Sequence, residues 1–233
     1  MPDGLTITRA AFARTVRLVS SARLRDAVLA SLADNADELA ALAELEGATS
    51  TRLVAQDRGF ENAPAAQFVH GVPHAKFINA AFAYAKPRAL NRFNGPSRGA
   101  WYAALDTETC LDEVIFHMAE FLGQAGDFNA VVDYAEMYAS LAGEYLDLRP
   151  HPDHPSLDPD EAVGYPAGNA LAETVRTRGW NGVIYPSIRH YGGTCFAVLW
   201  PHAVQSVTAG EVIRLAWRGA RTPTIERGVT AAF

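Results

Sequence analysis

The chain has 233 residues, 49% hydrophobic and 20% charged, with a formal net charge of −6, which is the composition of a folded soluble protein with a core of its own. The negative balance argues against a protein that holds nucleic acid on a broad basic surface, and no apolar run approaches the length of a membrane span. Since there is no secretory signal pattern and only two cysteines occur, Cys110 and Cys195, we expect a cytoplasmic protein with reduced thiols and no membrane contact.

The first fifty residues predict a helical hairpin. Apolar residues recur there at three- and four-residue steps, the spacing of a helix face: Phe12, Val16, Val19, Leu24, Val28 and Leu32. Asp34 and Asn35 can cap a second helix, which Gly47 can end. The basic first segment and the acidic second one can pair by charge, whereas membrane binding by the basic segment is a weaker alternative. We therefore assign residues 1–65 to a helical N-terminal extension.

The remainder alternates between short strands and helices. Residues 99–105, 129–134, 145–148, 180–185 and 194–200 are predicted strands. Helices are predicted over 109–122 and 167–178, ending at Gly123 and Gly179, with a proline-rich loop over 150–166. This pattern indicates an α+β domain over residues 66–210, followed by a C-terminal tail over 211–233.

Charge is unevenly spread along the chain. Residues 133–161 have a net charge of −7, which leaves the rest at +1, so the overall acidity does not exclude an anionic substrate. Only Lys76 and Lys86 among the twenty basic residues are lysines, and guanidinium groups favour two-point contacts with carboxylates or phosphates. The glycine-rich nucleotide motifs and the nucleophile elbow are absent from the sequence, which disfavours Rossmann, P-loop and α/β-hydrolase enzymes.

Three residues within a short stretch could carry chemistry. Arg92 lies between Asn91 and a Phe-Asn-Gly-Pro turn, where donors could converge on a phosphate or a ribose, although pairing with a nearby acid is the simpler reading. Tyr102 shares a strand face with Ala100 and Ala104, so it could stack on a planar group or pack in the core.

Glu113 lies on the polar stripe of the 109–122 helix, which is otherwise apolar nearly all round. A carboxylate in that position is either a surface acid or a half-buried group at a cleft, where it would act strongly on a developing cation.

The order and spacing of Arg92, Tyr102 and Glu113 resemble those of the RES-domain family, named after an arginine, a glutamate and a serine. The motifs are Arg92-Phe-Asn94, Trp101-Tyr-Ala-Ala104, Leu111-Asp-Glu-Val114 and Gly182-Val-Ile-Tyr-Pro-Ser187. The resemblance covers about residues 66–205 and places the serine at Ser187. The extension, with Arg52 and the segment 77–82, resembles the ParT subgroup of toxins.

The resemblance implies an ADP-ribosyltransferase-like mixed sheet and the toxin of a type II toxin–antitoxin pair, with NAD+ as substrate and an Xre-like antitoxin as partner. Glu113 would hold a ribose hydroxyl and stabilise the cation, and Tyr102 would stack on the nicotinamide. Arg92 and Asn94 would fix ribose or pyrophosphate oxygens, with support from Ser187. Catalysis is thus assigned to Arg92, Tyr102 and Glu113, with no metal.

Three functions remain open from the sequence. ADP-ribose could pass to a protein acceptor, which for ParT-like toxins is associated with phosphoribosyl pyrophosphate synthetase, and the extension favours this reading. Alternatively, NAD+ could be split by phosphate or water. The third reading is a degenerate RES fold kept as an inert binding module. The presence of all four motif residues disfavours it: Arg92, Tyr102, Glu113 and Ser187.

The chain departs from the family pattern in two places. Asn91 stands where many members have glycine. Many members also carry an arginine on the first strand, about twenty residues before the position of Arg92, and here Lys76 is the nearest cation, although a point charge cannot copy a guanidinium fork. Arg189 and His190, just after Ser187, are further candidates for phosphate contacts. The cysteines are expected to pack as small core residues.

Overall fold

Three long strands joined in an antiparallel arrangement dominate the fold of this computed structural model, which describes residues 4–20, 65–83 and 90–230. The strands are β1 (Thr6–Ser20), β2 (Trp101–Ala104), β3 (Asn129–Asp147), β4 (Gly182–Pro186), β5 (Thr194–Val198), β6 (Val204–Arg218) and β7 (Thr224–Arg227). The helices are α4 (Ala75–Ala83), α5 (Thr107–Ala125) and α6 (Glu161–Thr177), with 3₁₀ turns at Ala65–Gln67, Pro155–Leu157 and Pro201–Ala203. The predicted α+β class is confirmed.

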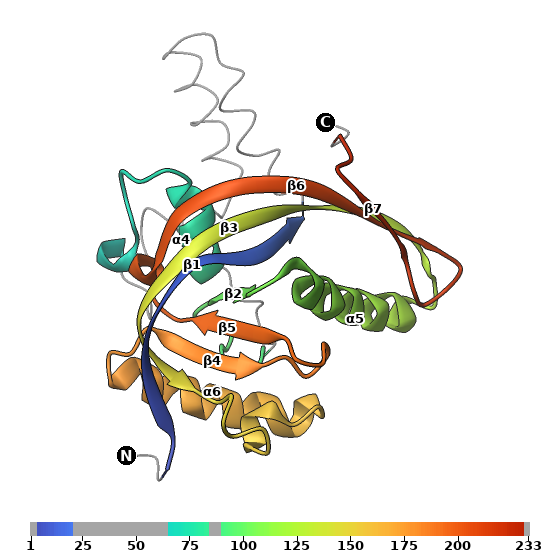
Figure 1. Ribbon diagram of the computed structural model, residues 1–233. Helices are drawn as coiled ribbons and strands as arrows, with labels where there is room; N and C mark the ends of the chain where they lie inside the picture. The colour runs from blue at the N-terminus through green and yellow to red at the C-terminus, as the bar shows by residue number, and fades with distance from the viewer. Residues whose placement is uncertain (1–3, 21–64, 84–89, 231–233) are drawn as a thin grey trace.

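The strands form one mixed sheet in the order β1-β2-β5-β4-β3-β6-β7. All neighbours are antiparallel except β3 and β4, which run parallel. β1 pairs with β3 from Thr6 to Ser20 and with β2 at Val16, so the strands β1-β2-β5-β4-β3 close on themselves. Figure 1 shows β1, β3 and β6 as a long arch above the shorter strands β2, β5 and β4.

Alternating side chains on the short strands supply two cores. On β5, Phe196 and Val198 pack on one side with Trp101 of β2. Cys195 and Ala197 pack on the other side, with Ala104 of β2. The two-residue period of a strand therefore divides these residues as the sequence predicted, with Trp101 and Tyr102 on opposite faces.

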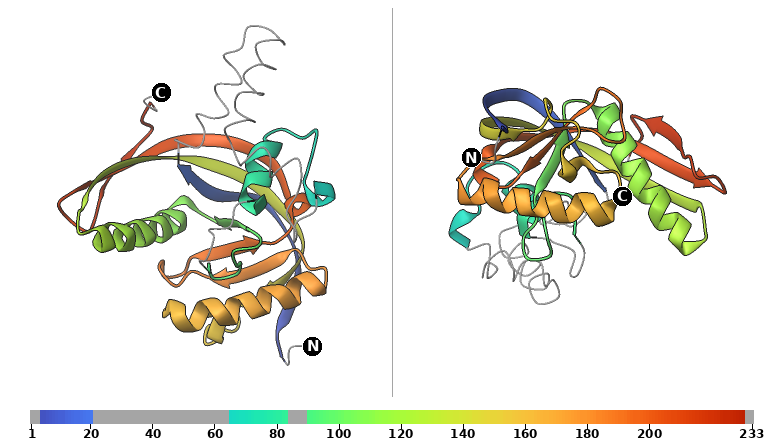
Figure 2. Two further views of the ribbon diagram at one scale, coloured as in Figure 1. Left: turned by 180° about the vertical axis from the view of Figure 1, so that it is seen from behind. Right: turned by 90° about the horizontal axis from the view of Figure 1, so that it is seen from below.

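The three helices cover different parts of the sheet, as Figure 2 shows from behind and from below. α4 packs Ile78 and Phe82 against the Trp101 core, and α6 packs Leu171 and Val175 against the opposite one. α5 lies beneath the arch of β3 and β6, where its apolar face meets residues of both strands. No helix in the described ranges is long and apolar enough to cross a membrane.

Local contacts fix the position of α5. Asp106 caps the helix by accepting a hydrogen bond from the Thr109 N–H, and Gly126 ends it with a φ of 72°. Thr107 Oγ1 donates to Glu136 of β3 over 2.5 Å. Burial acts to raise the pKa of Glu136, but hydrogen bonds from Thr107 and Tyr138 outweigh it and the net shift is downward. The helix start is therefore tied to an ionised carboxylate on the arch.

The predicted helix near the N-terminus is wrong at residues 12–20, which lie in β1. Phe12 and Val19 pack toward one core, whereas Val16 and Leu18 pack toward the other. The register shifts between Phe12 and Thr15, so a strand buried on both faces and interrupted by a bulge produced the three- and four-residue spacing. The predicted second helix, with Asp34, Asn35 and Gly47, lies outside the described residues, as does Arg52.

Other predicted bounds also change. The strands predicted at 129–134 and 145–148 are the two ends of β3, and the tail assigned to 211–233 instead continues β6 to Arg218 and adds β7. α6 begins at Glu161 and contains Pro166, so the predicted loop over 150–166 is too long. Asp160 caps this helix. The N-terminal strand and the C-terminal strands thus belong to the same sheet as the predicted domain.

Candidate active site

A pocket of about 340 Å³ opens between α5, α6 and the short strands. Arg92, Tyr102 and Glu113, which the sequence singled out, all line it. The rest of the wall comes from segments far apart in the chain: Arg17, Leu18, Asn91, Ala103, Ala104, Cys110, Val114, His117, Met118, Tyr134, Tyr165, Tyr185, Ile188, Arg189 and Cys195. The pocket falls in the size range of small-molecule sites.

Arg92 is buried, and backbone oxygens hold its guanidinium group. Nη1 donates to the carbonyl of Ser156 over 2.6 Å and to the carbonyl of Asp158 over 3.0 Å. Helix α6 can approach this residue only through glycines, because a Cβ at Gly168 would lie 2.0 Å from the Arg92 carbonyl oxygen and one at Gly164 would lie 2.7 Å from Nη1. The expected alternative, pairing with an acid, is not found among the described residues. Within the part of the chain that the structure describes, this cation is thus held through Nη1, and Nε and Nη2 remain for a ligand.

The Tyr102 hydroxyl is part of the same support. It donates to Asn94 Oδ1 over 2.9 Å and accepts from the Phe93 N–H over 3.0 Å. Burial raises the pKa of Tyr102, so the phenol stays protonated. Asn94 also donates to the carbonyl of Arg98. Asn94 therefore lies behind Tyr102 and orients its ring, without itself lining the pocket.

Glu113 is bound from the side by Ser187. The Ser187 hydroxyl donates to Glu113 Oε1 over 2.7 Å and accepts from the backbone N–H groups of Arg189 and His190. Because one hydroxyl links the carboxylate to the loop after β4, the glutamate and serine of the sequence motif meet although they are 74 residues apart. Ser187 itself does not line the pocket.

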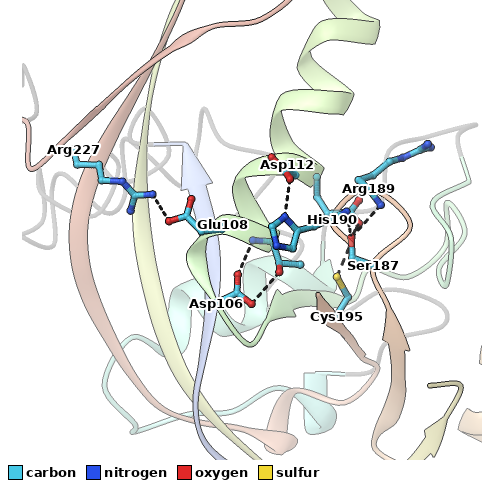
Figure 3. A network of polar contacts seen from close by, with 10 residues as sticks. Asp106, Glu108, Asp112, Ser187, Arg189, His190, Cys195 and Arg227 are labelled. Atoms are coloured by element: carbon cyan, nitrogen blue, oxygen red, sulfur yellow. Dashed lines mark hydrogen bonds and ion pairs between the residues drawn. The ribbon is translucent and has the colours of Figure 1, made fainter. Parts of the chain in front are cut away.

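A second contact fastens the same loop to α5. His190 Nδ1 lies 2.7 Å from Asp112 Oδ2, where the protonated ring donates to the carboxylate. The hydrogen bond to Asp112 raises the pKa of His190, with further support from the charges of Asp106 and Glu108. Figure 3 shows these residues between α5 and the loop, with the Arg189 side chain extending away from Ser187.

Arg17 is the charged site residue that the sequence reasoning missed. It lies on β1, lines the pocket and donates from Nη1 to the Tyr102 carbonyl over 3.1 Å, with its guanidinium carbon 5.0 Å from the Trp101 ring centre. Arg17 thus places a second guanidinium group on the pocket wall, next to Tyr102. Lys76, the proposed substitute, is exposed on α4 and does not line the pocket. Arg17 lies 75 residues before Arg92 rather than about twenty, so only a correct strand prediction for residues 6–20 could have found it.

Aromatic residues complete the wall. Tyr165 of α6 donates its hydroxyl to Glu161, and its ring centre lies 5.3 Å from the Arg92 guanidinium carbon. Tyr185 packs against Phe93 from β4. Sequence reasoning passed over both tyrosines, since it placed Tyr165 in a loop and treated Tyr185 only as part of a strand motif.

The two cysteines flank Glu113 but are not equipped to be nucleophiles. Cys195 Sγ lies 4.0 Å from Glu113 Oε1, and Cys110 Sγ donates to the carbonyl of Val16 over 3.1 Å. Burial raises the pKa of Cys110 to about 12, and it raises the pKa of Cys195 well above its usual value. Both thiols are therefore protonated and act as small packing groups. Within the described ranges, no group of three or more metal-ligating side chains comes together.

The pocket has a positive balance in an acidic protein. Three arginines line it, Arg17, Arg92 and Arg189, while Glu113 is the one carboxylate among the lining residues. Such a wall suits a ligand that carries more than one negative charge and also places one carboxylate where a positive charge develops.

Comparisons with known proteins give one family match. The model of the RES domain matches residues 68–218. No curated protein matches the chain. Among solved structures, the Mycobacterium tuberculosis MbcT–MbcA toxin–antitoxin complex contains a chain with 16% identity and a TM-score of 0.40, over 54% of this chain and 72% of that one. With so low a TM-score, that likeness establishes neither a function nor a partner for the present chain.

Proposed function

The chain belongs to the RES domain family, whose model matches most of its length, and from this premise we propose that it is the toxin of a toxin–antitoxin pair and uses NAD+ as its substrate. The observation that carries the proposal is the position of Glu113. This carboxylate lines a pocket with three arginines and is oriented by the Ser187 hydroxyl.

The proposed reaction breaks the bond between the nicotinamide nitrogen and the anomeric carbon of the ribose. The electron pair of that bond leaves with the nicotinamide, which becomes neutral, and the ribose takes on oxocarbenium character. The Glu113 carboxylate stabilises that positive charge and holds a ribose hydroxyl. An acceptor then forms a bond to the same carbon and gives up its proton.

The other residues hold the substrate in place. Tyr102 offers its ring to the nicotinamide, because Asn94 and the Phe93 N–H fix its hydroxyl from behind. Arg92 offers Nε and Nη2 to ribose or phosphate oxygens, because the carbonyls of Ser156 and Asp158 occupy Nη1. Such fixed groups lower the entropic cost of reaching the reactive geometry.

We favour a protein as the acceptor of ADP-ribose, as in the ParT-like toxins that the extension resembles, with phosphoribosyl pyrophosphate synthetase as the first candidate to test. Phosphorolysis or hydrolysis of NAD+ is the alternative. Both reactions use the same pocket and differ only in the group that reaches the anomeric carbon.

The test follows both products of NAD+ carrying a label in its adenylate half. The purified protein is incubated with labelled NAD+ alone, with inorganic phosphate, or with phosphoribosyl pyrophosphate synthetase, and nicotinamide release and protein labelling are measured. Labelling of the added protein supports transfer, whereas release that requires phosphate and labels nothing supports phosphorolysis. If no nicotinamide is released under any condition, both enzymatic readings fail and the inert binding module stands.

The toxin role has a separate test in cells. Induced expression of the wild-type chain in bacteria should arrest growth, while Glu113→Gln should not, and co-expression of an Xre-like antitoxin should restore growth. Equal growth with the wild-type and Glu113→Gln chains would contradict the toxin role. Western blots at matched levels exclude a difference in expression.

A further inference from the structure

Arg189 lies on the pocket wall in a loop that is held firmly at two points. On one side of Arg189, Ser187 bonds to Glu113. On the other side, Gly192 and Gly193 lead into β5. His190 pairs with Asp112. Because Arg189 lies between these two anchored residues, its backbone is placed beside α5 even without a ligand.

No carboxylate neutralises the Arg189 guanidinium among the residues that the structure describes. Its carbon lies 3.4 Å from the centre of the Phe116 ring, and Nε is buried with no hydrogen-bond partner. Both acids of α5 that contact this loop have other partners, Asp112 with His190 and Glu113 with Ser187. An aromatic face can hold a guanidinium group but cannot satisfy its N–H donors. The side chain is therefore positioned yet still lacks an acceptor.

The chemistry that would satisfy these donors is that of a phosphate. A guanidinium edge forms two parallel hydrogen bonds to a phosphate group, and each gains strength from the charges. Arg92, on the α6 side of the pocket, uses Nη1 for its hydrogen bonds to the described residues, so its Nε and Nη2 edge remains for a ligand. The pocket thus presents one such edge from the α6 side and a second from the α5 side.

We propose that Arg189 is a phosphate-binding residue of this pocket. The inference rests on the proposed function and deepens it by assigning the anion contact on the α5 side. Two sources supply the same chemistry: the pyrophosphate of the dinucleotide, or inorganic phosphate bound as the acceptor.

Calorimetry can separate the sources without requiring turnover. ADP-ribose and inorganic phosphate are titrated separately into the wild-type protein, Arg189→Gln, Arg189→Lys and the control Arg178→Gln, which changes an exposed arginine at the end of α6. Loss of a charge-assisted contact should weaken one ligand about ten- to a hundredfold in Arg189→Gln. Arg189→Lys should recover part of the affinity, and Arg178→Gln should match the wild type. Thermal melting checks that each variant is folded.

Each outcome decides the inference. Weaker binding of ADP-ribose assigns Arg189 to the pyrophosphate, and weaker binding of phosphate alone assigns it to the acceptor. Unchanged affinity for both ligands in folded Arg189→Gln, or no binding of either ligand to the wild type, would overturn the proposal. Nicotinamide release by the wild type is measured alongside, because its absence would defeat the proposed function while leaving the calorimetric answer valid.

Discussion

The two sides of the pocket hold their charged groups in different ways. On the α6 side, backbone oxygens fix Arg92, and the Phe93 N–H together with Asn94 fixes Tyr102. On the α5 side, side chains hold one another: Ser187 bonds to Glu113, and His190 bonds to Asp112. A group held by the backbone is part of the fold, whereas a group held by another side chain can be altered without disturbing the core. Substitutions on the two sides should therefore separate stability from activity.

The largest effect is expected on the α5 side, from Glu113→Gln. The amide keeps the size of the side chain but cannot stabilise a developing cation, so kcat for nicotinamide release should fall about 10³-fold. The melting temperature should stay close to that of the wild type, because Glu113 lies at the pocket rather than in a core. Stopped assays of nicotinamide measure the first quantity and thermal melting the second.

A matched control is Glu120→Gln, on the same helix but outside the pocket lining, where the carboxylate pairs with exposed Arg221. It should keep wild-type turnover. If Glu113→Gln retained activity, the carboxylate would have been assigned to the wrong residue.

Arg92→Lys tests the α6 side and should change both properties. An ammonium group cannot reach the carbonyls of Ser156 and Asp158 and also present an edge to the ligand. Leaving buried acceptors unsatisfied costs about 1–3 kcal/mol, which lowers the melting temperature by several degrees. We expect kcat/KM to fall about ten- to a hundredfold as well. A loss of activity at an unchanged melting temperature would show that Arg92 is not part of the fold's support.

Tyr102→Phe should have a smaller effect, on the same side. The ring remains, but the Phe93 N–H and Asn94 Oδ1 lose their shared partner. We expect turnover to fall about tenfold, because the ring loses its fixed orientation. Tyr102→Ala, which also removes the ring, should lose more. Equal activity in these two variants would argue that the ring does not contact the substrate.

The smallest effect is a dependence on pH through His190. Its hydrogen bond to Asp112 raises the pKa of the imidazole above its usual value of 6.5. The ion pair is thus fully present below pH 6.5 and is lost as the pH rises through the raised pKa. Because the pair is exposed, we expect a change of a few-fold at most in the apparent KM for NAD+.

Asp112→Asn is the matched variant for that profile. It removes the carboxylate that pairs with His190, so no ion pair is left to be lost as the pH rises and the KM should no longer change over this range. An identical profile for the wild type and Asp112→Asn would mean that another group titrates.

The sequence predicted the part of the site that is contiguous in the chain. Arg92, Tyr102 and Glu113 lie on a loop, a strand and a helix that follow one another, so family spacing was enough to bring them together. Ser187 was also singled out, because it directly follows a strand with a recognisable motif. Its hydrogen bond to Glu113 could not be derived from either segment alone, since it depends on how the loop after β4 meets α5.

The sequence failed where pairing between distant segments determines structure. Arg17 was hidden because apolar residues on both faces of β1 imitate a helix, and its pairing with β3 joins residues more than a hundred positions apart. Tyr165 was hidden because Pro166 suggested a loop where α6 has already begun. For Arg17, pairing with β3 made a strand of a segment whose local spacing is typical of a helix. For Tyr165, the Asp160 cap starts α6 before the proline that suggested a loop.

The most direct test of the account is a crystal structure of Glu113→Gln with bound NAD+, in which slow turnover preserves the substrate. The account predicts the nicotinamide ribose next to residue 113, the nicotinamide ring against Tyr102, and phosphate oxygens within hydrogen-bond distance of Arg92. NAD+ bound outside this pocket, or bound inside it with the adenine next to residue 113, would contradict it.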